Sequence, residues 1–441
     1  MAHASYTSRR SGLTTAVVVR RAASPCNWTS RTRVSPWRSS ERRFPVSDEP
    51  ERRLDYSTTS LEDARVRSVG LFSGIGGLEL GLCDAGIETE LLCEYWEPAA
   101  DTLRRRFDAP VVGDIRELRS LPTADIVAAG FPCTDLSQVG RTAGISGDES
   151  GLIREVFRLV ADTPPTWLVL ENVPNMLTLQ GGSPIRHVTE WLDENGWNWA
   201  YRTVDSRHFG VRQRRRRVFL VASKTQDPRT VLFADETGGS SAQKRHTAYG
   251  FYWTEGNRGI GWGEGVVPTL KGGSKLGIAS PPAVWIPSAE DGRAICRPSI
   301  AAGERLQGFR AGWTDGSGTL GERWKLVGNA VTVPVAKWLG SRLVAPGYPV
   351  DVDRRALTPG RRWPFAASSV AGNREAWSIG ERPVDKRSGV SLMNLLDRYT
   401  AEPLSLGATS GFTKRLKAST LRRDDRFVAA LDAHIAALTA G

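Results

Sequence analysis

Two side chains in this sequence can act together as a nucleophile and an acid: Cys133 and Glu171. Cys133 lies in the segment Ala129-Gly-Phe-Pro-Cys133, at the end of a run predicted to be a strand. Glu171 directly follows the next such run, Trp167 to Leu170. Because parallel strands place their ligands beyond their carboxyl ends, we expect the thiol and the carboxyl group to face one crevice. A thiolate that adds to an electron-poor carbon beside a proton donor is the chemistry that this pair can do.

Cys133 also has a simpler interpretation, because an isolated buried cysteine is more often inert packing. The preceding Pro132 and the polar run Thr134-Asp-Leu-Ser-Gln138 argue against a core position. We therefore predict that Cys133 lies on a rigid turn at the edge of a sheet.

A basic run, Val211-Arg-Gln-Arg-Arg-Arg-Arg217, leads into another predicted strand, Val218 to Ala222. Such a run is usually a solvated face. Beside a reactive pocket, alternate arginines can instead point inward while their neighbours reach phosphates. We interpret Arg215 and Arg217 as the inward, catalytic pair.

A glycine-rich segment, Leu71-Phe-Ser-Gly-Ile-Gly-Gly77, follows the first predicted strand and opens a helix. Taken alone it is as well explained by a structural turn, but this is also where the backbone can approach a nucleotide-like ligand closely. Glu79 stands where a GxGxxG motif has its third glycine, which argues against a pyrophosphate site. Glu94 ends the second predicted strand about 20 residues later, where an acidic side chain commonly binds ribose hydroxyls.

Further candidate ligand-binding residues stand at neighbouring strand ends. Tyr95 and Trp96 offer a ring that can stack on adenine, and Asp114 can accept a hydrogen bond from the adenine amino group or simply cap a helix. Sites at successive strand ends predict one crevice for the cofactor. The candidate cofactor-binding residues are Phe72, Ser73, Gly74, Ile75, Gly76, Gly77, Glu94, Tyr95, Trp96, Asp114, Ile115, Gly130, Pro132, Asn329 and Ala330.

The elements that must position these residues are those of an α/β fold. From Val69 onward short apolar runs alternate with amphipathic stretches, as in a parallel sheet with crossover helices. The predicted strands are Ser68 to Phe72, Thr89 to Cys93, Asp125 to Ala129, Trp167 to Leu170 and Val218 to Ala222. The predicted helices are Leu78 to Ala85, Pro98 to Phe107, Leu152 to Ala161, His187 to Asn195, the stretch Trp324 to Leu343, and a last helix through Phe427 and Leu438.

Composition limits the partners of this 441-residue chain. A formal net charge of +11 favours a polyanionic partner, although a basic protein need not bind nucleic acid. The five cysteines and five histidines show no spacing typical of metal ligands, so we expect no metal. No apolar run approaches the roughly 18 residues of a membrane span, so we expect a cytoplasmic protein. We also expect it to be a monomer.

In order and spacing these motifs resemble those of the DNA (cytosine-5) methyltransferases, over about residues 66 to 345. The matching segments are Phe72-Ser-Gly-Ile-Gly-Gly77 for the cofactor loop, Pro132-Cys133 for the nucleophile, Glu171-Asn-Val173 for the acid, Gln213-Arg-Arg-Arg-Arg217 for the QxRxR motif, and Glu304-Arg-Leu-Gln-Gly-Phe309 with Gly328-Asn-Ala-Val331 for two late motifs. The sequence departs from the usual pattern at Thr134-Asp135 and at Tyr95-Trp96, which leaves open which ring stacks on the adenine.

The resemblance implies a Rossmann-like, S-adenosylmethionine-dependent domain with a small target-recognition domain, acting on a flipped-out cytosine in double-stranded DNA. Cys133 would add to C6 of the cytosine while Glu171 protonates N3, and residues 134 to 150 would close over the base. The DNA-binding residues implied are Gln138, Gln213, Arg214 and Thr269.

The resemblance also divides the chain. We expect 1–64 to be a disordered basic arm, although a transit peptide has the same composition. Residues 65–223 and 295–345 would form the catalytic domain, 224–294 an irregular target-recognition domain, and 346–441 an extension of unknown role.

Three other functions are less consistent with the sequence. A transfer-RNA cytosine methyltransferase would use the same Cys133 and Glu171, but its recognition segment is typically shorter. A nicotinamide-dependent oxidoreductase is disfavoured because the GxGxxG spacing is absent. A non-catalytic DNA-binding module is disfavoured because every reacting group is present.

Overall fold

A computed structural model describes residues 65–131, 151–237, 248–257, 259–272, 281–290, 292–358, 362–386 and 390–440, which all fall in one compact unit. The arm 1–64 and three candidate site residues, Pro132, Cys133 and Gln138, lie outside the described residues.

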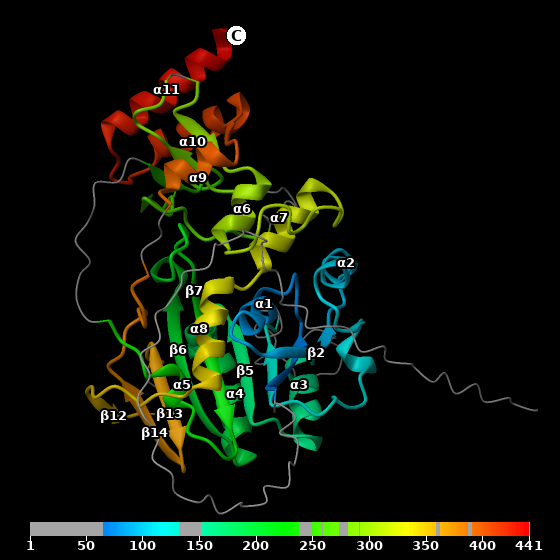
Figure 1. Ribbon diagram of the computed structural model, residues 1–441. Coiled ribbons are helices and arrows are strands. Elements are labelled where there is room, and N and C mark those ends of the chain that lie inside the picture. The colour runs from blue at the N-terminus through cyan, green and yellow to red at the C-terminus, as the bar shows by residue number, and fades with distance from the viewer. Residues whose placement is uncertain are drawn as a thin grey trace, which may run out of the picture. The chain divides into compact units, whose positions relative to one another are not determined.

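The larger of two sheets has ten strands in the order β12-β14-β13-β6-β7-β5-β4-β1-β2-β3 (Figure 1). Its parallel part contains β1 (Arg67–Leu71), β2 (Glu88–Cys93), β3 (Val111–Val112), β4 (Ile126–Ala129) and β5 (Trp167–Asn172). Strand β7 (Arg216–Ser223) lies antiparallel between β5 and β6 (Asn198–Asp205). This mixed sheet confirms the predicted Rossmann-like α/β fold.

Helices cover both faces of this sheet, because successive side chains of a strand point in opposite directions. In β4, Val127 and Ala129 join one core, while Ile126 and Ala128 join the other. The first core is closed by α3 (Leu152–Asp162) and α4 (Ser183–Glu194). The second is closed by α1 (Gly77–Cys83), α5 (Arg229–Leu232) and α8 (Val333–Val344), and α1 packs directly against α8. Helix α2 (Glu97–Arg106) contacts β3 and α7 (Leu320–Asn329), which also contacts α6 (Ile300–Leu306).

One expectation about these elements was wrong, and one strand was missed. The stretch Trp324 to Leu343 is not one helix but two, because Ala330 takes an extended conformation (φ −61°, ψ 149°) and Pro334 can stand only in the first turn of α8. Strand β6 was not predicted at all. The charged Arg202 near its centre interrupts the apolar pattern by which a buried strand is recognised, although β6 is almost entirely buried.

The smaller sheet contains five short strands in the order β15-β11-β10-β8-β9. They are β8 (Tyr249–Phe251), β9 (Gly263–Glu264), β10 (Ala283–Trp285), β11 (Ile295–Arg297) and β15 (Glu402–Pro403). Strands of two or three residues carry no readable alternation, which is why the sequence of 224–294 suggests an irregular segment.

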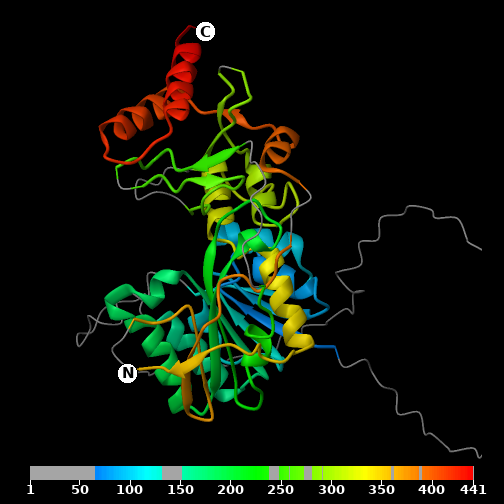
Figure 2. The same ribbon diagram turned by 90° about the vertical axis from the view of Figure 1, so that its left-hand side faces the viewer.

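Helices from the C-terminal part of the chain complete this smaller sheet. They are α9 (Leu392–Arg398), α10 (Leu406–Ala418) and α11 (Asp425–Ala440). Phe412 and Phe427 pack on Phe251 and Trp285, with ring centroids 5.0 Å apart in the pair Phe251–Phe412. Figure 2 shows α10 and α11, in orange and red, beside these strands.

The C-terminal extension also completes the larger sheet, through β12 (Arg354–Ala356), β13 (Ala366–Val370) and β14 (Asn373–Trp377). Strand β13 pairs with β6 and covers its edge. The buried Arg202 guanidinium donates to Gly380 O (2.8 Å), Asp235 O (2.6 Å) and Leu232 O (3.1 Å), and it forms an ion pair with Glu236.

We therefore expect truncation after residue 345 to prevent folding of the whole chain. The cut removes β13, exposes the edge of β6 and takes one acceptor from Arg202, and an incompletely paired buried charge alone costs about 3–5 kcal/mol. Soluble yield and the thermal unfolding midpoint measure the effect. A truncated protein that unfolds at the wild-type temperature would contradict this interpretation.

Candidate active site

A cavity of about 1010 Å³ opens beyond the carboxyl ends of the parallel strands, where an α/β sheet binds its ligands. Phe72 follows β1, Glu94 follows β2 and Gly130 follows β4 on its wall. The predicted site residues that line the cavity are Phe72, Gly74, Glu94, Tyr95, Trp96, Asp114, Ile115, Gly130, Glu171, Arg217, Thr269 and Asn329.

The glycine-rich loop takes a conformation that its sequence makes possible. Gly74 and Gly76 have φ values of 58° and 79°, which glycine adopts without strain. Phe72 has φ 55°, a strained value that costs of order 1–3 kcal/mol for a side chain of this kind. A Cβ on Gly77 would lie 2.3 Å from Val331 O, so glycine here lets the late segment pack against the loop.

Glu94 fastens this loop to the end of β2. One carboxylate oxygen accepts from the Gly74 N–H and the other from the Trp96 N–H, each at 2.8 Å. Burial raises the pKa of Glu94, and the two backbone hydrogen bonds oppose that shift. Each oxygen keeps a lone pair, so the carboxylate can still accept hydrogen bonds from a ligand.

The other cavity residues near Glu94 differ in their exposure and in their contacts. Tyr95 is 75% exposed, whereas the Trp96 ring has the Lys325 ammonium 4.3 Å from its centroid. Asp114 accepts from the Arg116 N–H (3.0 Å), as a helix cap does, and the Arg116 guanidinium lowers the pKa of Asp114. Asp114 therefore does act as a helix cap, and it lines the cavity as well.

Glu171 and Arg217 form an ion pair on the cavity wall, with Oε1 and Nε 2.9 Å apart. They meet because β5 and β7 are neighbours in the sheet. Burial raises the pKa of Glu171, while the charges of Arg217 and Arg215 pull it down. A carboxyl group in this setting can hold a proton or form an ion pair, depending on what binds beside it.

Asn172 ties the end of β5 to the segment that leads to Cys133. Its amide donates to Phe131 O (3.1 Å), and its carbonyl accepts from the Val173 N–H (2.8 Å). Phe131 stands two positions before Cys133 in the chain. The end of β5 therefore positions the backbone from which the Cys133 segment leaves.

Comparison with known proteins identifies the family of this chain. The profile of the family described as C-5 cytosine-specific DNA methylase matches residues 66–254. The Type II methyltransferase M2.BsuMI of Bacillus subtilis (strain 168) is 42% identical over 395 residues, covering 83% of this chain and 97% of the relative. The chain belongs to this family.

Other similar proteins match shorter parts or less closely. The Type II methyltransferase M.BsuFI of Bacillus subtilis is 32% identical over 155 residues, which is 35% of this chain and 38% of the relative. A crystal structure of the S. pombe Dnmt2 methyltransferase is 14% identical with a TM-score of 0.49, covering 64% of this chain and 98% of that one. The long match to M2.BsuMI shows the present chain to be a DNA cytosine-5 methyltransferase.

Arg215, unlike Arg217, is buried in this methylase and does not line the cavity. Its guanidinium donates to Leu270 O (3.0 Å) and Ala330 O (2.8 Å), so it joins three segments that are far apart in sequence. Burial lowers the pKa of Arg215.

Gln213 and Thr269 also connect these segments through hydrogen bonds. Gln213 is fully buried, donates to Leu306 O and Gln307 Oε1 (3.1 Å each), and accepts from the Leu270 N–H (2.8 Å). The Thr269 hydroxyl donates to Arg214 O at 2.9 Å. In this structure the side chain of Gln213 is thus directed into the protein, whereas Thr269 lies on the cavity wall.

The remaining predicted residues in the described part of the chain do not line the cavity. They are Ser73, Ile75, Gly76, Gly77, Arg214 and Ala330. Besides Arg116, which pairs with Asp114, two lysines on the wall, Lys271 and Lys325, were missed. Neither stands in a recognisable pattern, and only the packing of Lys271–Gly272 against Gly328 brings the first of them to the cavity.

Substitution of Arg215 and of Arg217 should affect stability and activity differently. Arg215→Ala removes the hydrogen bond to Leu270 O and the shorter of two hydrogen bonds to Ala330 O, and we expect it to lower the free energy of unfolding by about 3–5 kcal/mol. Arg217→Ala should cost less stability, because the buried Glu171 can take up a proton when its partner is lost, but it should abolish most methyl transfer. Thermal unfolding and a methyl-transfer assay on both variants separate these effects; equal loss of stability in both would contradict the assignment.

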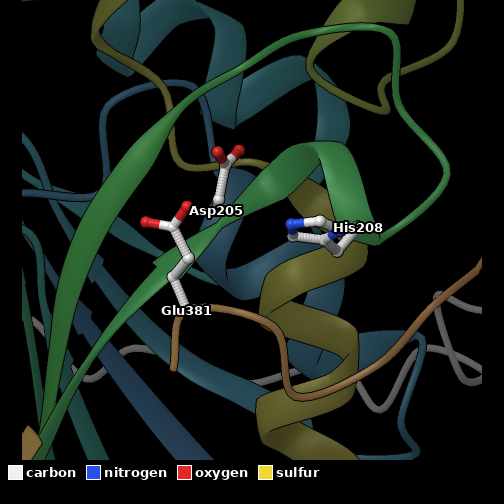
Figure 3. A group of neighbouring side chains, drawn as sticks. All are labelled: Asp205, His208 and Glu381. Atoms are coloured by element: carbon white, nitrogen blue, oxygen red, sulfur yellow. The ribbon is translucent and has the colours of Figure 1, made fainter. Parts of the chain in front are cut away.

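Asp205, His208 and Glu381 form a cluster of potential metal ligands, with their ligand atoms within 4.8 Å of one another (Figure 3). Arginines already engage the acids: Arg207 Nε lies 3.1 Å from Asp205, and Arg216 Nε lies 2.6 Å from Glu381. Burial and the charge of Arg207 lower the pKa of His208 to about 4. We interpret the cluster as an ion-pair network that fastens the C-terminal extension to the turn after β6.

Among the described residues, no helix is both long and apolar enough to cross a membrane.

Proposed function

We propose that this methylase transfers a methyl group from S-adenosylmethionine to C5 of a flipped-out cytosine in a short, specific sequence of double-stranded DNA, through a covalent bond between Cys133 and C6. The observation that carries the proposal is a single cavity whose wall contains both the Glu171–Arg217 pair and the Glu94-anchored loop. A methyl donor and a base can therefore meet in one enclosed space.

The residues of the cavity fit S-adenosylmethionine. Glu94 would accept hydrogen bonds from the ribose hydroxyls, Asp114 would accept one from the adenine amino group, and Tyr95 or Trp96 would stack on the ring. The volume of about 1010 Å³ is enough for a ligand of this size with a base beside it. When bound, S-adenosylmethionine supplies an electrophilic methyl group on a positively charged sulfur.

The chain's own residues activate the base. The Cys133 thiolate would form a bond to C6, the C5–C6 π electrons would shift to make a C4–C5 double bond as the C4–N3 double bond opens, and Glu171 would deliver a proton to N3. Arg217 would hold the cytosine O2. C5, now electron-rich, could accept the electrophilic methyl group of the donor. Loss of the C5 proton to a base and elimination of the Cys133 thiolate would restore the C5–C6 double bond, and N3 would return its proton to Glu171.

Arg217 connects base binding to the state of the acid. Its positive charge lowers the pKa of Glu171 while the two are paired. If the entering base engages Arg217, that effect weakens, and burial, already the largest cause of the shift, is opposed less. The pKa of Glu171 then rises, so that the acid is protonated when the ring needs a proton.

DNA recognition belongs, in this proposal, to the segment 224–294 with its smaller sheet. Arg214 and Thr269 lie at its junction with the cavity, and Lys271 on the wall, which pairs with Glu255 here, could exchange that partner for a phosphate. The net charge of +11 is consistent with a polyanionic substrate. The name of the relative M2.BsuMI favours a role in restriction and modification.

The proposal is tested by methyl transfer from tritiated S-adenosylmethionine to duplex DNA and to transfer RNA. We expect label in DNA alone, and bisulfite sequencing of DNA from cells expressing the chain should give one short target sequence. Label in transfer RNA alone would overturn the DNA assignment, and affinity for NAD without affinity for S-adenosylmethionine would overturn the reaction class.

A further inference from the structure

Glu79 carries a carboxyl group that the proposed reaction does not use. It lies in α1 and is only 1% exposed, directly behind the glycine-rich loop. Its Oε2 atom has no hydrogen-bond partner among the residues that the structure describes. A buried acid in this condition is costly, so its presence calls for a physical reason.

The carboxyl group of Glu79 fills a space that Gly70 leaves empty. A Cβ atom on Gly70 would lie 2.3 Å from Glu79 Oε1 and 2.6 Å from Ser73 Oγ. The carboxyl group therefore stands between the end of β1 and the first residues of the loop. The Ser73 hydroxyl lies beside it and favours its ionised form.

Ser73 links this group to the cavity. Its neighbours Phe72 and Gly74 both line the wall, and both have positive φ values. The Gly74 N–H is the donor to Glu94. Any shift of Ser73 would thus move the strained turn and the anchor of the proposed cofactor site together.

We propose that Glu79 is a positioning residue for the cofactor loop, whose carboxyl group occupies the space left by the side chain missing at Gly70, packs beside Ser73, and places a negative charge behind the site for S-adenosylmethionine. This inference rests on the proposed cofactor. It assigns Glu79 a role in binding affinity and in the preference for a positively charged ligand.

The charge of Glu79 is open to change near neutral pH. Burial, the largest cause, raises its pKa to about 7, and the nearby Glu94 carboxylate raises it further. Glu94, at the end of β2, is the charged group that faces it. As the pH rises through this range Glu79 ionises, so attraction for a sulfonium ligand should increase with pH.

The experiment measures dissociation constants by calorimetry for S-adenosylmethionine and for S-adenosylhomocysteine, which lacks the sulfonium charge, from about pH 6 to about pH 8. We expect the wild-type preference for S-adenosylmethionine to grow several-fold over this range and to stay flat in Glu79→Gln. Glu97→Gln is the matched control, because Glu97 is exposed on α2 and pairs with Arg104. An unchanged slope in Glu79→Gln would overturn the charge role.

A second pair of variants tests whether the Glu79 carboxyl group is needed to fill the space beside Gly70. Glu79→Ala should weaken binding of both ligands, and Gly70→Asp combined with Glu79→Ala should recover part of the loss by supplying a carboxyl group from β1. Binding of Glu79→Ala equal to wild type would overturn the positioning role. If Glu79→Ala fails to fold, the near-isosteric Glu79→Gln decides. Failure of the wild-type protein to bind S-adenosylmethionine would instead refute the proposed function.

Discussion

Replacing Cys133 with serine is expected to abolish methyl transfer, by more than about 10⁴-fold in rate, while S-adenosylmethionine still binds. A thiol ionises near about pH 8.5 in peptides, whereas a serine hydroxyl stays protonated and cannot add to the C6 carbon at neutral pH. Transfer of tritiated methyl groups to duplex DNA measures the rate, and calorimetry measures the cofactor affinity. Near-normal turnover by this variant would refute the mechanism.

A second cysteine provides the control for this prediction. Cys296 is buried in the smaller sheet, and burial raises its thiol pKa to about 12, so it stays protonated and unreactive. Cys296→Ala should therefore keep most of the activity. DNA carrying 5-fluorocytosine gives an independent readout, because fluorine cannot leave C5 as a cation. The wild-type enzyme should remain covalently attached to such DNA, and Cys133→Ser should not.

Glu171→Gln is expected to lower the single-turnover rate by roughly 10²–10⁴-fold, because an amide cannot deliver the proton that N3 needs. The sign of the pH effect follows from the acid role. Only the protonated carboxyl group donates, and burial raises its pKa. The wild-type rate constant for the chemical step should therefore fall as the pH rises through that pKa, and the variant should lose this dependence.

Glu97→Gln serves as the matched substitution here too, since it removes an exposed carboxylate with the same change in shape. It should turn over like the wild type. A rate for Glu171→Gln within about tenfold of wild type would contradict the assigned role, because general acid catalysis of this kind contributes more than that.

The amino-acid sequence by itself determined the reaction class and most of the framework that supports it. Short apolar runs placed β1, β2, β4, β5 and β7 within one or two residues of their observed bounds. The polar residues that follow such runs had to meet at one edge of the sheet, because parallel strands end together. For that reason the sequence alone assigns Glu94, Asp114 and Glu171 to one crevice, and all three line the same cavity.

The tertiary structure alone decided which side chains of a motif face the cavity and which hold it together. Arg215 and Arg217 are equivalent in sequence, yet Arg215 bridges Leu270 and Ala330 while Arg217 meets Glu171. Likewise nothing local predicts that β13 pairs with β6, or that Glu79 fills the space beside Gly70. Such contacts join residues far apart in the chain or depend on the detailed packing of neighbours, and sequence periodicity records only the direction of a side chain within its own element.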